Sequence, residues 1–148
     1  MVQLPKVTIY TDGSCEPNPG PGGWAAILLT PDQQEIQLSG GEAQTTNNRM
    51  ELTAAIQALQ SVANPSEIIL FTDSQYLQKG ITEWLPNWIK RNWRASSGPV
   101  ANQDLWKALV ELKGKHTIQW QWTRAHVGTK YNEKADKLAS QAMQKYKK

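Results

Sequence analysis

Two segments of the chain end an apolar run on an aromatic residue, a threonine and an aspartate. KVTIYTDGSC reaches Asp12 in this way, and IILFTDSQY reaches Asp73. If both runs are strands, their carboxylates lie at strand ends, where α/β sheets place their sites. Taken singly, Asp12-Gly13 is also a good turn dipeptide, and Asp73 could cap a helix that begins near Ser74. Together, at matching strand ends, the two acids favour a functional site.

Two further acids border the apolar stripes of expected helices. Glu51 follows Asn48 by three residues and adjoins the stripe of its helix, although it could also complete a capping box with Asn48. Asp136 borders a similar stripe near the C-terminus, where the other interpretation is a solvated helix face. An acid beside a buried stripe points toward the sheet, so both could join the first two aspartates.

Four close carboxylates repel one another unless divalent cations neutralise them. Mg²⁺ is the expected cation because it takes hard oxygen ligands and is commonly shared with substrate phosphates. Two ions roughly 4 Å apart can activate a water and stabilise the leaving oxygen in phosphodiester displacement. The acids therefore predict a metal-dependent reaction on a phosphate substrate.

Periodicity supplies the elements that would position these acids. Alternating or continuous apolar patterns predict five strands, at 6–11, 23–29, 34–38, 67–72 and 116–123. Helical spacing predicts five helices, at 48–62, 74–79, 82–91, 102–113 and 132–146. DGSCEPNPGPGG is expected to be a turn segment, and strand 67–72 is expected to be buried on both faces. This order predicts an α/β fold with a mixed sheet flanked by helices.

Length and composition limit the class of protein. The 148 residues, 39% of them hydrophobic, suit one domain, which we take to span residues 1–148. No run of eighteen apolar residues and no signal-like segment is present, which predicts a cytoplasmic protein without a membrane partner. A single cysteine excludes an internal disulfide and a cysteine-rich zinc site.

The charge is divided unevenly along the chain. Residues 1–78 hold two basic and eight acidic residues, which gives a net charge of −6. Residues 79–148 hold fourteen basic and five acidic residues, which gives a net charge of +9. Such asymmetry is compatible with a polyanionic partner bound by the second half, and equally with an uneven solvated surface.

Four blocks of sequence together resemble the signature blocks of type 1 ribonuclease H, in the order of that family. They are YTDGSCEPNPGPGGW, TTNNRMEL, FTDSQY and RAHVGTKYNEKADKLA. The resemblance covers nearly the whole chain. It implies a ribonuclease H-like fold, with three antiparallel strands followed by two parallel ones, and magnesium-dependent hydrolysis of the RNA strand of RNA–DNA hybrids to 5′-phosphate and 3′-hydroxyl ends.

The resemblance also implies roles for individual residues. Asp12 would bridge two Mg²⁺ ions, Glu51 and Asp73 would hold one of them, and Asp136 would hold the other, with Mn²⁺ a possible substitute. His126, on a loop that contains a glycine, suits proton transfer near the leaving group or product release. His116, at a strand start, is expected to be an idle surface residue.

By the same resemblance, small polar residues would contact the hybrid by its shape, 2′-hydroxyls and phosphates. The residues implied near the minor groove are Cys15, Glu16, Asn18, Asn48 and Gln75. Thr46 and Arg49, with Asn102 as a neighbour, resemble a pocket for a DNA-strand phosphate. The second interpretation is structural, because NPGPGG is a good turn and Thr46 or Asn48 could simply begin a helix.

The segment EWLPNWIKRNWRASSGP interleaves tryptophans with bases, within a basic protrusion at about 82–100. Such a segment suits a nucleic-acid backbone channel, although its tryptophans could instead pack it against the domain. The family resemblance assigns it to gripping the DNA strand. The residues concerned are Trp84, Trp88, Lys90, Arg91, Trp93 and Arg94.

The chain departs from the family pattern in two places. Ala125 stands where glycine is expected before His126, which predicts a stiffer loop. RASSGPVANQ carries only one base, which predicts weaker, more salt-sensitive hybrid binding. The expected protein is a free-standing monomeric nuclease. Two alternatives stay open: a related DNA nuclease of integrase or resolvase type, and a hybrid-binding module without activity.

Overall fold

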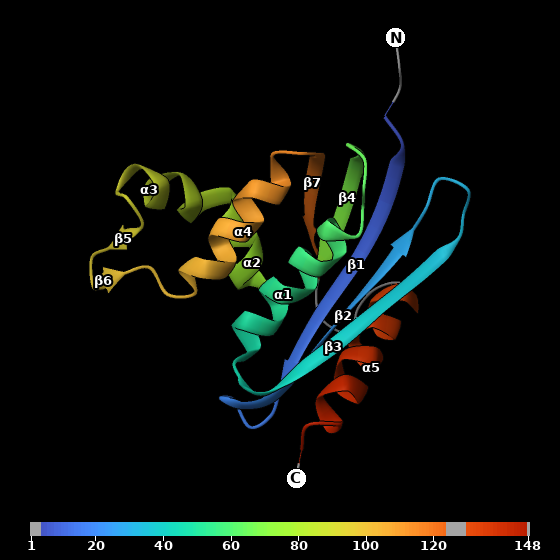
Figure 1. Cartoon of the computed structure of the whole chain (residues 1–148), viewed down its shortest axis with the longest axis horizontal. Coiled ribbons are helices and arrows are strands. Elements are labelled where there is room, and N and C mark those ends of the chain that lie inside the picture. The colour runs from blue at the N-terminus through green and yellow to red at the C-terminus, as the bar shows by residue number, and fades with distance from the viewer. Residues whose placement is uncertain (1–3, 124–129, 148) are drawn as a thin grey trace.

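Five strands form one mixed sheet in the order β3-β2-β1-β4-β7 (Figure 1). The structure, a computed structural model, describes residues 4–123 and 130–147. Strands β1 (Lys6–Cys15), β2 (Gly20–Leu29) and β3 (Glu35–Thr45) are antiparallel neighbours. Strands β4 (Glu67–Thr72) and β7 (Thr117–Trp122) run parallel to β1. The predicted α/β sheet, three antiparallel strands followed by two parallel ones, is confirmed.

Helices cover both faces of this sheet. Helix α1 (Asn47–Gln60) packs on β1 and β2 and contacts α4 (Gln103–Lys113), whereas α5 (Lys130–Gln144) packs on β1, β2 and β3. Figure 1 shows α5, in red, beyond the strands from α1 and α4. Among the described residues, no helix has the length and apolarity needed to cross a membrane.

The protrusion is built differently from the expected helix at 82–91. Helix α2 (Gln75–Lys79) continues through a π-helical turn, η1 (Gly80–Trp84), into α3 (Leu85–Lys90), and a short hairpin of β5 (Arg94–Ala95) and β6 (Gly98–Pro99) follows. Gly80 accounts for the tight packing at the π-turn, because a Cβ there would lie 2.1 Å from the Trp106 ring. Figure 1 shows α3 and the hairpin standing away from the sheet.

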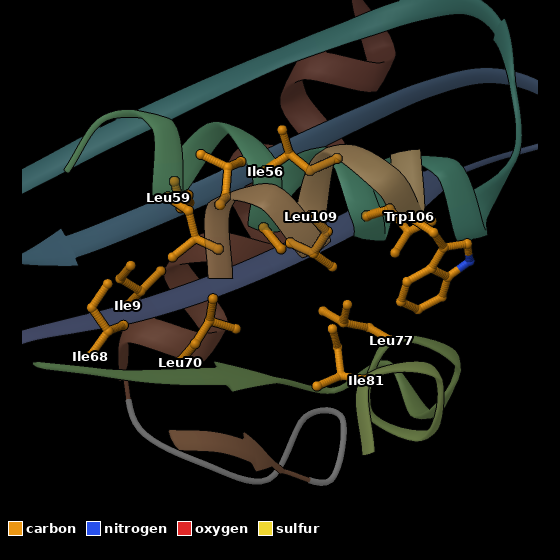
Figure 2. Close-up of a cluster of buried hydrophobic side chains, with 14 of the residues drawn as sticks. Ile9, Ile56, Leu59, Ile68, Leu70, Leu77, Ile81, Trp106 and Leu109 are labelled. Carbon is orange, nitrogen blue, oxygen red and sulfur yellow. The ribbon is translucent and has the colours of Figure 1, made fainter. Parts of the chain in front are cut away.

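The larger core lies between the sheet and the helices α1 and α4 (Figure 2). Val7 and Ile9 of β1 face it, as the alternation of the strand predicts, and Leu59 and Leu109 meet them from the two helices. Each such buried side chain stabilises the fold by about 1.5 to 3 kcal/mol relative to its exposure to water.

A smaller cluster lies under α5 on the other face. Tyr10 stacks on Phe71 with ring centroids 4.9 Å apart and also meets Tyr131 of α5. Strand β4 is not buried on both faces, so that prediction is wrong: Ile69 is 38% exposed. The reason is that α5 packs mainly on β1, β2 and β3 and reaches β4 only at Phe71.

The first strand is longer than expected. β1 does not stop at Thr11 but pairs with β2 as far as Cys15, opposite Gly22. Only residues 16–19 connect the two strands, so DGSC is strand rather than turn. An Asp-Gly pair favours a turn locally, but the ladder to β2 overrides that preference.

Candidate active site

Asp12 and Asp73 come together, although Asp12 is not at the end of its strand. β1 pairs with β4 only as far as Tyr10 and Phe71, while it continues along β2, so Asp12 projects just beyond the parallel part of the sheet. Asp73 directly follows β4. The prediction of neighbouring carboxylates is therefore right, and its premise that both strands end there is right only for β4.

Helix α1 carries Glu51 to the same place. Thr46 caps this helix by accepting a hydrogen bond from Arg49 N–H at 3.2 Å, so Glu51 does not form the capping box with Asn48. Instead Glu51, 3% exposed, accepts the Gly13 N–H through Oε1 at 2.9 Å.

The Gly13 amide also holds Asp12. The same N–H lies 2.9 Å from Asp12 Oδ1, so one donor serves both carboxylates. A Cβ on Gly13 would lie 2.6 Å from Glu51 N, which means that only glycine lets β1 approach α1 this closely. This role of Gly13 was not predicted from the sequence, although a glycine directly after a candidate acid was a usable signal.

Three carboxylates form one cluster. One oxygen each from Asp12, Glu51 and Asp73 lies within 4.8 Å of the others. Asp136 of α5 lines the same open cavity of about 330 Å³, next to these three acids. The cavity lining further includes Gly13, Asn47, Asn48, Ser74, Gln75 and Tyr76. The structure thus brings together the four predicted acids and two of the predicted substrate contacts.

Burial and mutual repulsion keep these acids from ionising freely. Burial raises the pKa of Asp12 to about 11, and the negative charges of Glu51 and Asp73 add to the effect. Burial also raises the pKa of Glu51 to about 8, with the charge of Asp73 as the next cause. Without a cation, the site therefore holds protons at neutral pH.

The donor set fits a hard divalent cation. Glu51 Oε2 is buried and has no hydrogen-bond partner among the described residues. An orphaned buried carboxylate oxygen costs free energy unless a cation meets it. Within residues 4–123 and 130–147 the cluster consists of carboxylates, which are the ligands typical of Mg²⁺ or Mn²⁺.

The remaining predicted minor-groove residues lie on the segment between β1 and β2 and at its edge. Glu16 and Asn18 are exposed. Asn18 Oδ1 accepts the Asn47 N–H at 3.1 Å, which ties this segment to the start of α1. Cys15 is half-buried, and its Sγ lies 3.4 to 3.5 Å from the carbonyl oxygens of Pro17, Gly20 and Thr45. The thiol is therefore held by the segment's own backbone.

Thr46, Arg49 and Asn102 are neighbours, as expected. Arg49 donates to Asn102 Oδ1 at 3.3 Å, and its backbone N–H donates to Thr46. Asp104, which was not predicted from the sequence, forms a two-pronged ion pair with the Arg49 guanidinium at 2.9 and 3.1 Å. The two residues are 55 positions apart, and no local pattern announces the pairing.

In the protrusion, the tryptophans pack and the bases face solvent. The ring centroids of Trp84 and Trp88 lie 5.7 Å apart, and those of Trp88 and the buried Trp106 lie 5.3 Å apart. Trp93 packs beneath Lys107, whose ammonium lies 5.5 Å from the ring centroid. The exposed cations of this segment are Lys90, Arg91 and Arg94.

Of the two histidines, His126 lies outside the described residues, together with Ala125. His116 is not an idle surface residue. It is half-buried, and its Nδ1 accepts the Ser66 N–H at 3.1 Å, which joins the starts of β4 and β7. Burial, and then the charge of Lys115, lowers the pKa of His116.

Known proteins resemble this chain over nearly its whole length. A family model described as RNase H matches residues 5–144. Ribonuclease H of Granulibacter bethesdensis is 54% identical over 137 residues, 92% of this chain and 91% of that protein. Ribonuclease HI of Pseudomonas aeruginosa is 54% identical over 144 residues, 97% of each. Among solved structures, LC9-RNase H1, described as a type 1 RNase H with the type 2 active-site motif, superposes with a TM-score of 0.88 at 31% identity, covering 99% of this chain and 76% of that one.

Proposed function

Because the chain belongs to the ribonuclease H family, we propose that it is an endonuclease that hydrolyses the RNA strand of RNA–DNA hybrids. The observation that carries the proposal is the buried cluster of Asp12, Glu51 and Asp73, in a cavity shared with Asp136. An idle binding module has no use for repelling acids that raise one another's pKa. The products would be 5′-phosphate and 3′-hydroxyl ends.

The four acids would hold Mg²⁺, for which Mn²⁺ could substitute. Bound in this way, the cations would activate water and stabilise the leaving oxygen. The chain's own contribution is to orient the ligands: the Gly13 amide holds Asp12 and Glu51 with one donor. His126 is proposed, from the family resemblance, to move a proton near the leaving group.

Hybrid recognition would begin at the cavity rim, where Asn48 and Gln75 lie beside the acids. The exposed bases of the protrusion would attract the phosphates of the DNA strand. Thr46 and Asn102 remain candidates for a phosphate contact, whereas Arg49 would first have to give up part of its pairing with Asp104. We further propose that the protein acts as a monomer in the cytoplasm, which size-exclusion chromatography and cell fractionation would test.

A cleavage assay tests the activity. The parent protein should cut the RNA strand of a hybrid when Mg²⁺ is present and should not cut when a chelator removes it. Asp12→Asn should abolish cleavage while hybrid binding persists, and Asp32→Asn, at an exposed acid on the β2–β3 connection, should leave cleavage unchanged. Cutting of duplex DNA in place of the hybrid would favour the integrase-like alternative, and binding without cutting would favour the inactive module.

A second assay tests the protrusion. Replacing its three exposed cations with alanine should raise KM for the hybrid much more than it lowers kcat, because these side chains bind phosphates away from the cluster of acids. The dependence of affinity on salt should also become shallower. An unchanged KM would remove the protrusion from the binding surface. The variant carries Lys90→Ala, Arg91→Ala and Arg94→Ala.

A further inference from the structure

An indole outside the carboxylate cluster contacts the backbone of one of its members. Trp122, the last residue of β7, donates its Nε1–H to the carbonyl oxygen of Asp73 at 3.1 Å. Asp73 stands one residue beyond β4, and the ladder between β4 and β7 ends at the pair Thr72 and Trp122. The Asp73 carbonyl is therefore hydrogen-bonded by a side chain rather than by the backbone of a neighbouring strand.

The peptide groups on both sides of Asp73 are also held. The Thr72 carbonyl accepts the Thr123 N–H at 2.8 Å. The Ser74 N–H donates to Thr72 Oγ1 at 3.1 Å, and Ser74 in turn caps α2 by accepting the Leu77 N–H. With the indole bond added, the backbone that carries Asp73 is fixed in orientation between β4 and α2.

Backbone orientation matters more for Asp73 than for a longer acid. An aspartate carboxylate stands one carbon from Cα, so a small rotation of its peptide displaces the carboxylate directly. Asp12 and Glu51 are each held at a carboxylate oxygen by the Gly13 amide. The Trp122 bond gives Asp73 a comparable restraint through its main chain.

The indole is unusual among the tryptophans for its exposure. Trp122 is 39% exposed, whereas Trp106 is fully buried. Water could satisfy an exposed indole N–H, and a half-exposed ring contributes less packing than a buried one. The N–H of Trp122 can therefore be removed with little loss of core packing.

We propose that Trp122 is a positioning residue for Asp73, and that its indole N–H raises the affinity of the carboxylate cluster for a divalent cation. The inference rests on the proposed function for its consequence in catalysis, but the effect on cation binding is independent of any substrate. Partners that orient metal ligands typically change metal affinity or activity by about tenfold or more when removed.

The test compares Trp122→Phe with Trp120→Phe. Trp120 lies on the same face of the same strand, and within residues 4–123 and 130–147 its indole N–H makes no hydrogen bond. Titration calorimetry with MgCl₂ or MnCl₂ alone, on each folded protein without substrate, should show about tenfold weaker binding in Trp122→Phe and parent-like binding in Trp120→Phe. Thermal melts confirm folding, and Trp122→Tyr provides a second variant without the indole.

A spectroscopic measurement adds a readout that packing alone would not move. The indole ¹H–¹⁵N resonance of Trp122 is assigned as the one that is missing from the spectrum of Trp122→Phe. In the parent protein this resonance should shift when Mg²⁺ binds. With a hybrid substrate, kcat at limiting Mg²⁺ should fall while KM for the hybrid stays unchanged.

Three results would overturn the proposal. They are unchanged cation affinity in Trp122→Phe, an equal loss in Trp120→Phe, and a raised KM for the hybrid with unaltered cation affinity, which would make the exposed ring a substrate contact. If the parent protein fails to cut hybrids but the two variants still differ in cation affinity, the proposed function fails and the role of Trp122 stands.

Discussion

Replacing Asp12 with asparagine should stabilise the metal-free fold, even though it should abolish cleavage. Asp12 is 5% exposed and faces Glu51 and Asp73, so its carboxylate is held where ionisation is unfavourable. Asparagine keeps an oxygen that can accept the Gly13 N–H, removes the charge, and offers an N–H₂ donor toward the orphaned Glu51 Oε2.

The size of the effect follows from proton linkage. The ordinary pKa of 3.8 lies about three units below neutral pH, so keeping Asp12 protonated in the folded state costs up to about 4 kcal/mol at pH 7. Relaxation and water in the open cavity reduce this cost, so we expect Asp12→Asn to raise the free energy of unfolding by about 1 to 3 kcal/mol.

The sign depends on pH. Because the pKa of Asp12 is raised on folding, the parent is most stable below the unfolded-state pKa and loses stability as pH rises toward the folded-state value. The advantage of Asp12→Asn should therefore be small near pH 4 and large near pH 8.

Urea denaturation at these two pH values, with a chelator present, measures the difference. Asp32→Asn serves as the control and should leave stability within about 0.5 kcal/mol of the parent. Adding Mg²⁺ should raise the Tm of the parent more than that of Asp12→Asn, because the variant lacks one of the carboxylates that would bind the cation. An Asp12→Asn variant that is less stable than the parent at pH 8, or whose advantage is the same at both pH values, would show that the Asp12 carboxyl carries no ionisation cost in the folded state.

Three further changes test other parts of the structure. Gly13→Ala should cost about 1 to 3 kcal/mol in urea denaturation and lower Mg²⁺ affinity, since its Cβ would meet the α1 backbone; parent-like values for both would contradict the shared-donor role. Asn92→Gly should raise stability by up to about 1 kcal/mol, because Asn92 has a φ of 55° after α3; a lowered urea midpoint would count against this account of the turn. His116→Asn keeps an acceptor near the Ser66 N–H but does not titrate, so it should lose less stability than the parent between about pH 7 and about pH 5. The pKa of His116 is lowered on folding, so its hydrogen bond to Ser66 stabilises the fold above about pH 6.5 and is lost as pH falls. Equal losses of stability in the two proteins would exclude that hydrogen bond as the cause.

Local pattern was sufficient to locate the elements with a regular apolar spacing. The stripe in 48–62 predicted α1 because its apolar spacing is that of a helix packed on a sheet, and the run at 67–72 predicted the bounds of β4 but not its burial. The four acids could be grouped because two lie where β1 and β4 stop pairing, and the other two lie on helices that pack on β1. What remained beyond the sequence depended on distant partners.

Asp12-Gly13 is such a case, because pairing with β2 turns a favourable turn dipeptide into strand. The π-turn at Gly80 depends on the Trp106 ring, which arrives from α4, and the ion pair of Arg49 joins two helices. His116 shows the same limit, since only the neighbouring strand supplies the Ser66 N–H. The spacing of residues along the sequence does not indicate any of these contacts.

The unequal size of the two hydrophobic clusters has a consequence for how the site comes apart. Within residues 4–123 and 130–147, the cluster under α5 holds fewer buried side chains than the one joining the sheet to α1 and α4. Partial unfolding should therefore release α5 before the rest, with faster amide exchange along α5 than along α1. Such an opening would carry Asp136 away and leave Asp12, Glu51 and Asp73 assembled, and the four acids would then belong to two units of different cooperativity.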